Sequence, residues 1–268
     1  MIYHKALSGL PFHGEALASA PPDQSPPLIL DVGSSTARWA QETAWRRRDA
    51  IVYAIDLTPT TTITSKEHRT LFPNLHHLHP INLLTSTSPV KSETISLVNL
   101  SLLLGHVRSW ETLFRSTYRC LFPGQGRLQF VDIDWELCCE DDDKDGEDMQ
   151  SYRNWWSGLK TASRLAGKPL QYPSNVRRLL EDTGFVDVEE TVVKIRFDSD
   201  SASRTSARER AVADWFQAAM MSDERDLLGM CLALFTRVFG MARVEVEEEC
   251  RGVLGAMRRG GRGRFVRL

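Results

Sequence analysis

The sequence lacks several features that would define other classes of protein. Its 268 residues contain no uninterrupted apolar stretch near the roughly twenty residues that a membrane-spanning helix needs. The amino terminus does not show the charged, apolar and cleavage-site series of a secretory signal. The five cysteines have no CxxC spacing and no histidine cluster beside them. We therefore expect reduced thiols, no zinc site, no membrane insertion, and a cytoplasmic or nuclear protein.

The chain also lacks an excess of charge of one sign. Lys and Arg together number 33 and Asp and Glu number 35, so the formal net charge is -2. This balance gives no general attraction to nucleic acid or to anionic lipid, and we expect no direct nucleic-acid binding. The arginines of the tail could meet an acidic partner, but we favour a basic end that complements a helix dipole. These arginines are Arg251, Arg258, Arg259, Arg262, Arg264 and Arg267.

Glycine is scarce at the most informative position of the chain. An apolar run at 28–30 ends at Asp31, and a second run at 51–55 ends at Asp56. The turn between the first run and the intervening helix is Gly33-Ser-Ser-Thr-Ala37, which contains one glycine. A strand, a small-residue turn, a helix and a second strand with a terminal acid are typical of a nucleotide-cofactor half-site. Without the GxGxxG pattern, a nicotinamide oxidoreductase is disfavoured.

Short apolar strands and helices alternate along the first half of the chain, which predicts a parallel sheet covered on both faces. We expect strands at 28–32, 51–56, 77–83, 94–100 and 126–135, and helices at 36–48 and 110–121. Beyond these lie helical sequence at 151–183, a strand at 184–197, helices at 207–221, 224–239 and 243–258, and a final strand at 263–268. We expect a single domain: a lead-in at 1–27, a cofactor-binding core at 28–135, an acidic loop and helical insertion at 136–183, and C-terminal strands and cap helices at 184–268.

Eight stretches of the chain follow one another in the order in which similar stretches occur in a known family. They are Ile29-Leu-Asp-Val-Gly33 with Arg38-Trp-Ala40, Ala54-Ile-Asp-Leu-Thr-Pro59, Gly105-His-Val-Arg-Ser-Trp110, Tyr118-Arg-Cys-Leu-Phe-Pro-Gly124, Asp132-Ile-Asp134, Gly167-Lys-Pro-Leu170, Leu180-Glu-Asp-Thr-Gly-Phe-Val-Asp-Val188 and Leu234-Phe-Thr-Arg-Val238. With these stretches, residues 4–268 resemble the fungal LaeA-like methyltransferases. That family is a branch of the class I S-adenosylmethionine-dependent fold, associated with control of secondary metabolism and development.

The resemblance implies an α/β fold: a doubly wound, Rossmann-like seven-stranded sheet with its last strand antiparallel and extra helices over the cofactor end. It also implies S-adenosylmethionine as cofactor, a protein or small-molecule methyl acceptor, and pairing with a related methyltransferase-like subunit. The acid that ends the first strand and the turn would face the methionine part of the cofactor, and the later positions would contact ribose, adenine and the floor near the methyl group. The implied cofactor-binding residues are Asp31, Gly33, Ser34, Ser35, Thr36, Ala37, Asp56, Leu57, Asn82, Leu83, Asn99 and Ser101.

A departure from the family pattern in the turn at 33–37 leaves alternatives open. Members of the family usually have Gly-Thr-Gly-Thr-Gly at 33–37, and a Ser or Ala held at positive φ costs on the order of 1 kcal/mol. The chain could therefore be an active methyltransferase or a weak or inactive subunit that regulates an active relative. A third hypothesis is another reaction in the same pocket, such as a cyclisation. No catalytic base is assigned, because Asp132 and Asp134 could equally cap a loop.

We predict no metal site. In the acidic run at 140–148, Asp141, Asp143, Asp145 and Gly146 match the opening of a calcium-binding loop, but the twelfth position is Tyr152 where a bidentate Glu is required. Four of the seven histidines are candidate ligands, but they have no acidic or cysteine partner nearby in the sequence; they are His76, His77, His79 and His106. Five of the seven tryptophans could form an aromatic pocket but are expected in the core; they are Trp110, Trp135, Trp155, Trp156 and Trp215.

Overall fold

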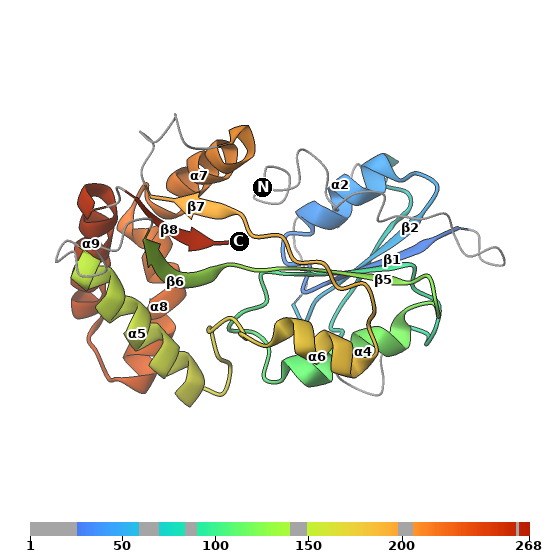
Figure 1. The fold of residues 1–268 in the computed structure, drawn as a ribbon, viewed down its shortest axis with the longest axis horizontal. Helices are drawn as coiled ribbons and strands as arrows, with labels where there is room; N and C mark the ends of the chain where they lie inside the picture. The colour runs from blue at the N-terminus through green and yellow to red at the C-terminus, as the bar shows by residue number, and fades with distance from the viewer. Residues whose placement is uncertain (1–25, 59–69, 84–89, 140–148, 198–205, 261–262) are drawn as a thin grey trace.

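A five-stranded parallel sheet forms the centre of the first half of the chain (Figure 1). The computed structural model describes residues 26–58, 70–83, 90–139, 149–197, 206–260 and 263–268. The sheet has the order β3-β2-β1-β4-β5. Its strands are β1 (Leu28–Val32), β2 (Ile51–Ile55), β3 (Leu75–Leu78), β4 (Leu97–Ser101) and β5 (Arg127–Val131). All neighbouring strands pair in parallel, as the alternation of strands and helices predicts.

Helices cover both faces of this sheet because its central strands are apolar on both sides. Helix α2 (Arg38–Arg46) lies on one face, and helices α4 (Trp110–Cys120) and α6 (Val176–Thr183) lie on the other (Figure 1). Along β1, Ile29 belongs to the hydrophobic cluster on the α2 side, and Leu30 and Val32 belong to the cluster on the α4 and α6 side. The two-residue alternation of a strand thus divides β1 between two cores.

A smaller antiparallel sheet and four helices form the rest of the molecule. Its strands β6 (Asp134–Cys139), β7 (Lys194–Arg196) and β8 (Arg264–Arg267) are ordered β6-β8-β7. Helices α5 (Gln150–Leu165), α7 (Ala207–Met220), α8 (Glu224–Val238) and α9 (Arg243–Gly260) gather around it (Figure 1). Two capping boxes, Ser206 with Glu209 and Asp223 with Asp226, begin α7 and α8.

The two sheets together have the strand order expected of a seven-stranded sheet, but they are separated between β5 and β6. Strands β5 and β6 are separated by Asp132 and Ile133 alone. When β5 and β6 are counted as one bent strand, the order becomes that of a seven-stranded sheet whose last strand, β8, is antiparallel. The doubly wound parallel core is confirmed, but in the described chain the expected single sheet is two sheets. The bend follows from the buried Asp132 carboxylate, which accepts backbone hydrogen bonds from Leu103, Leu104 and Ile133.

Two predicted strands are wrong in extent. The strand expected at 77–83 ends at Leu78, and the strand expected at 184–197 is reduced to Lys194–Arg196. In the latter, Gly184 terminates α6 with φ 114 and Asp187 has φ 52, so the chain cannot extend regularly through this segment. Val186 is 82% exposed and Val192 is 56% exposed, whereas Phe185 and Val188 pack against the cluster on the α4 and α6 side. The apolar residues of this segment therefore do not form one buried strand face.

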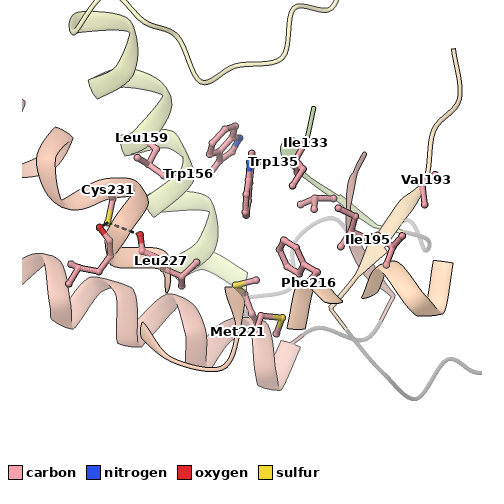
Figure 2. Close-up of a cluster of buried hydrophobic side chains, with 14 of the residues drawn as sticks. Ile133, Trp135, Trp156, Leu159, Val193, Ile195, Phe216, Met221, Leu227 and Cys231 are labelled. Carbon is pink, nitrogen blue, oxygen red and sulfur yellow. Dashed lines mark hydrogen bonds between the residues drawn. The ribbon is translucent and has the colours of Figure 1, made fainter. Parts of the chain in front are cut away.

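One hydrophobic cluster extends through both parts of the molecule. It contains Ile29 and Leu97 from the parallel sheet together with Trp135 and Ile195 from the second sheet. Figure 2 shows side chains from β6, α5, β7 and α7 converging in this cluster, among them Trp135, Trp156, Ile195 and Phe216. Trp135, Trp155 and Trp156 are buried, so the prediction that they are core residues is confirmed. None of the described helices is long and apolar enough to cross a membrane.

Several predictions lie outside the described residues. They concern residues 1–25 of the lead-in and the acidic run at 140–148 with its calcium-like pattern. The assignment of the chain to a single domain stays a prediction.

Candidate functional site

The carboxyl ends of β1 and β4 meet where the direction of the chain through the sheet reverses. The chain passes from β1 to β2 on one side and from β4 to β5 on the other. The loops after two such strands diverge, and this topological switch point is where open α/β sheets bind ligands. Asp31 of β1 and Asn99 of β4 are register partners here, and Asn99 Nδ2 donates a hydrogen bond to Asp31 Oδ1 over 2.8 Å.

The turn after β1 has the backbone conformation that glycine favours, although most of its residues are not glycine. Gly33, Ser35 and Ala37 have φ values of 69, 49 and 52. The prediction that Ser35 and Ala37 replace glycines at positive φ is therefore confirmed. Gly33 cannot be replaced without movement, because a Cβ there would lie 2.6 Å from Leu103 Cδ2. The turn is anchored to β2 by hydrogen bonds from the amides of Gly33 and Ser34 to the Ile55 carbonyl.

Asp56 lies directly beside this turn at the end of β2. Its Oδ2 accepts the Ser35 amide hydrogen over 2.8 Å, and its Oδ1 accepts hydrogen bonds from the amide and the hydroxyl of Thr58. Burial raises the pKa of Asp56, but hydrogen bonds from Thr58, Ser35 and Leu57 outweigh it and lower the pKa below its usual value. Asp56 is thus held as a carboxylate against the turn.

Asp31 is more deeply buried than Asp56 and titrates differently. Its side chain is 2% exposed, and burial raises its pKa to about 7 although Asn99 and the Ala40 amide donate hydrogen bonds to it. The negative charge of Asp56 raises the pKa of Asp31 further. Ala37 has no side chain that can cap α2, so the Asp31 carboxylate also satisfies an amide of the first turn of that helix.

The other predicted site residues divide into two groups. Ser101 joins the polar group because Asn99 Nδ2 donates a hydrogen bond to its Oγ over 2.9 Å. Thr36 and Leu57 are exposed at the same edge of the sheet. Asn82 lies at the same edge, half-buried, on a segment whose Ile81 amide donates to the Asp56 carbonyl. Leu83, in contrast, is buried in the cluster between the sheet and α4, which gives it a packing role.

Two neighbouring aspartates, Asp132 and Asp134, have structural partners. Three amides donate to Asp132, whose pKa is nevertheless raised to about 6 by burial. Asp134 forms an ion pair with Arg267 and accepts the Glu136 amide hydrogen. Both carboxylates therefore hold the bend between β5 and β6, which favours the loop-capping interpretation over that of a catalytic base.

Sequence reasoning missed Gln129, the next residue across the sheet. Gln129 of β5 is the register partner of Asn99, and its Nε2 donates to Asn99 Oδ1 over 3.0 Å. The available signal was an amide between the apolar residues Leu128 and Phe130. Recognising it needs the strand register, which the sequence alone does not supply.

The described histidines are not arranged as metal ligands. Among the residues that the structure describes, no group of three or more His, Cys, Asp or Glu side chains could hold a metal ion. His106 instead lies 3.1 Å from the Leu104 carbonyl through its Nδ1.

Comparison with known proteins agrees with this geometry. A family model described as a methyltransferase domain matches residues 8–190. The chain belongs to this family. The match includes the turn at 33–37, Asp31 and Asp56 at the ends of their strands, and strands β4 and β5.

Relatives of this methyltransferase domain include fungal regulators. The chain is 28% identical over 213 residues to the secondary metabolism regulator LAE1 of Cochliobolus heterostrophus, covering 80% of this chain and 64% of the relative. It is 29% identical over 212 residues to the protein-methionine methyltransferase laeA of Emericella nidulans, covering 79% and 52%. The chain thus spans between half and two thirds of the length of these relatives.

Solved structures share the fold of this methyltransferase domain. The MccD protein matches with a TM-score of 0.51 at 12% identity, covering 99% of this chain and 91% of that one. Phosphoethanolamine N-methyltransferase 2 of Haemonchus contortus, solved with S-adenosyl-L-methionine, matches with a TM-score of 0.50 at 15% identity, covering 99% and 54%. At these identities the likeness establishes the fold.

The residues at the switch point fit a nucleotide cofactor of the kind that the resemblance implies. The turn has positive φ at three positions, and the two of these that are not glycine, Ser35 and Ala37, carry small side chains. Ser35 and Thr36 are exposed, whereas the Ala37 methyl group is buried in the core. Asp56, an ionised acceptor, lies next to them. The substitutions therefore preserve the backbone shape of a glycine-rich turn.

Proposed function

We propose that this chain binds S-adenosylmethionine at the carboxyl edge of the parallel sheet and transfers the methyl group to a protein or small-molecule acceptor. The observation that carries the proposal is the left-handed backbone at Gly33, Ser35 and Ala37, with the Asp56 carboxylate against the turn. A backbone that departs from ordinary conformations at the cost of strain is typical of a functional site. The role in secondary metabolism belongs to the proposal and is supported by the LaeA-like relatives.

Specific side chains would hold the cofactor. The turn at 33–37 would lie against its methionine part, with Asp31 beneath the turn as the nearest buried carboxylate. Asp56 would accept hydrogen bonds from the ribose hydroxyls, Asn82 would flank the adenine, and Asn99 and Ser101 would form the floor near the methyl group. The bound cofactor supplies an electrophilic methyl group on a sulfonium ion. The protein then needs to align the acceptor and exclude water, so a strong general base is not obligatory.

A second function, that of a regulatory subunit with weak or no activity, is favoured by a separate observation. Two residues of the turn carry a Cβ where family members have glycine, and the Asp56 oxygens already accept hydrogen bonds from Ser35 and Thr58. A ribose would have to share or displace these donors. If the chain is such a regulatory subunit, we propose that it pairs with a related methyltransferase-like subunit.

We also propose that the protein is located in the cytoplasm or the nucleus. Its five free thiols support such a reducing compartment.

Calorimetric titration with S-adenosylhomocysteine tests cofactor binding. We expect micromolar affinity for the unaltered chain and at least tenfold weaker binding for Asp56→Asn. Asp49→Asn is the matched control, because Asp49 is an exposed carboxylate paired with Arg47 in the loop between α2 and β2. No heat from the unaltered chain would reject cofactor binding.

Transfer of a labelled methyl group then separates the two functions. We expect the isolated chain to label acceptors in a lysate from which its own relatives have been removed. Binding without labelling would support the regulatory subunit instead.

A further inference from the structure

A continuous row of buried polar side chains crosses the middle of the parallel sheet. Asp31, Asn99 and Gln129 occupy adjacent positions in register on β1, β4 and β5. All three side chains are on the α2 side of the sheet, since the alternate positions Leu30, Val98 and Leu128 belong to the cluster on the opposite face. Their exposed fractions are 2%, 0% and 9%. Buried polar groups of this kind are retained only with their hydrogen bonds satisfied.

The hydrogen bonds of this row determine which way the Asn99 amide faces. Gln129 Nε2 donates to Asn99 Oδ1 over 3.0 Å, so Oδ1 faces β5. Asn99 Nδ2 then uses its two hydrogens for Asp31 Oδ1 at 2.8 Å and Ser101 Oγ at 2.9 Å. An asparagine amide has two donor hydrogens and one acceptor oxygen, so each group of Asn99 has a partner.

The orientation of Asn99 has consequences for its two acceptors. A donor that faces Asp31 stabilises the ionised carboxylate, whereas an oxygen in the same place would favour the protonated form. Ser101 accepts from Asn99, so its own hydroxyl hydrogen remains to donate at the end of β4. Both effects depend on Gln129, because a rotated Asn99 would present Oδ1 to Asp31 and Ser101.

We propose that Gln129 is a positioning residue of the cofactor site, which orients Asn99 so that Asn99 Nδ2 donates to Asp31 beneath the turn and the Ser101 hydroxyl is left as a hydrogen-bond donor. The ligand that benefits carries a positively charged group near the turn and an acceptor atom near Ser101. The inference rests on the proposed function, and Gln129 acts through Asn99 without contact to the ligand.

The groups around Asp31 define its expected pH dependence. Asp56, on the neighbouring strand, is the titratable group whose charge acts on Asp31, and it raises the pKa of Asp31. His77 lies two strands away in the same row, as the register partner of Ala54. From α2, the Ala40 amide donates to Asp31. With the pKa of Asp31 at about 7, binding of a cationic ligand should weaken as the pH falls from 8 to 6.

Three variants separate the orientation of Asn99 from general packing. Gln129→Glu keeps the shape and replaces the donor with an acceptor, which favours an Asn99 rotated with Oδ1 toward Asp31, and its added negative charge raises the pKa of Asp31 as well. The uncharged Gln129→Met variant therefore isolates the effect of the lost hydrogen bond. Gln129→Met removes the hydrogen bond and keeps a similar volume. Thr43→Val is the control: Thr43 is buried on α2, where its neighbour Ala44 belongs to the cluster on the α2 side of the sheet, and its hydroxyl has no hydrogen-bond partner within the described chain.

The deciding measurement is the carboxyl titration of Asp31 by carbon-13 NMR in the protein without ligand, followed by calorimetry with S-adenosylhomocysteine between pH 6 and 8. We expect Gln129→Glu to raise the titration midpoint by at least one pH unit and to weaken binding about tenfold at pH 7. Gln129→Met should also raise the midpoint and weaken binding, but by less. Thr43→Val should change neither the midpoint nor the affinity.

Different results would overturn the positioning role of Gln129 and the proposed binding of S-adenosylmethionine. An Asp31 midpoint that is unchanged in folded Gln129→Glu overturns the role of Gln129, whatever the binding result. If Gln129→Glu does not fold, the midpoint of Gln129→Met decides in its place. A chain that shows the expected midpoint shifts but releases no heat with S-adenosylhomocysteine retains the Gln129–Asn99–Asp31 coupling and loses the proposed cofactor.

Discussion

Ser35 and Ala37 stand where the family resemblance implies glycine, and both have positive φ. Ala37 lies in the core, so its methyl group adds packing where glycine would have none. Ser35 is exposed and gains no such packing, yet it adopts φ 49. Its amide donates to Asp56, which accounts for the conformation in spite of its strain.

The first prediction concerns this strained serine. Ser35→Gly should raise the free energy of unfolding by about 0.5–1 kcal/mol, because glycine has no Cβ and adopts positive φ without a clash. Chemical denaturation measures the change. Ser34→Gly is the matched control, since Ser34 is not among the described residues at positive φ and glycine there should destabilise the protein. Equal effects of the two substitutions would contradict the account of the turn.

The second prediction concerns the pH dependence of stability at Asp31. Burial raises the pKa of Asp31 from 3.8 to about 7, so the folded protein binds this proton more tightly than the unfolded chain. The contribution of Asp31 to stability is therefore fully present below pH 4 and is lost as the pH rises through 7. Asp31→Asn should be more stable than the unaltered chain at pH 8, on the order of 1–2 kcal/mol, with a smaller or opposite difference at pH 4.5.

Urea unfolding at the two pH values measures the Asp31 effect. Asp132, whose pKa is also raised, keeps its own contribution in both proteins and cancels in the comparison. The same stability difference at both pH values would show that Asp31 does not titrate in this range.

At the scale of elements, three helices with clear sequence signals follow them more closely than the strands do, whereas the helical sequence expected at 151–183 is divided into α5 and α6. Capping residues and an amphipathic pattern are local, and they mark α4, α7 and α8 within a residue or two of the expected bounds. The strand expected at 184–197 had the right alternation, but the positive φ values at Gly184 and Asp187 interrupt it. An alternating pattern becomes a strand only where a neighbour can pair with it, and Val193 pairs with Leu268 at the point where β7 begins.

The third prediction belongs to helix α8. Asp223 caps this helix, and its side chain accepts the Arg225 amide hydrogen over 2.9 Å. Asp223→Ala should lower the free energy of unfolding by about 1 kcal/mol, because a first-turn amide loses its partner. Asp223→Asn keeps a side-chain oxygen at the cap and should lose less than half as much. Thermal or urea denaturation of both variants decides, and an alanine variant as stable as the asparagine variant would exclude the capping role.

At the scale of the whole molecule, one hydrophobic cluster joins the parallel sheet to the second sheet and its helices. Phe216 of α7 is fully buried in that cluster, where it stacks on Phe197 and contacts Trp135. A cluster that includes side chains from β1, α2 and α9 couples elements from both ends of the chain. Unfolding of one part should therefore expose the packing surface of the other.

The fourth prediction tests the single-domain organisation through this cluster. Phe216→Ala should lower the free energy of unfolding by about 3–5 kcal/mol, because it opens a cavity in the shared core. Phe239→Ala, at a side chain that is 43% exposed, should cost much less. In both variants the transitions followed by far-UV circular dichroism and by tryptophan fluorescence should coincide. Two separate transitions would instead divide the chain into two domains.

The sequence by itself determined the class of fold, the turn at 33–37 and the two strand-end acids. These features are local, because apolar runs, small residues and turns can each be recognised within a short stretch of consecutive residues. The family resemblance also marked Ser35 and Ala37 as replacements of glycines, but their positive φ was established by the structure.

Only the tertiary structure decided which polar residues meet. The register of three strands brings Gln129 to Asn99 and Asn99 to Asp31, across 98 positions of chain between Asp31 and Gln129. Burial then separates two acids of similar sequence context, raising the pKa of Asp31 while hydrogen bonds lower that of Asp56. The bend at Asp132 likewise depends on amides from a distant loop. Register, burial and long-range hydrogen bonds arise from packing, so no stretch of sequence contains them.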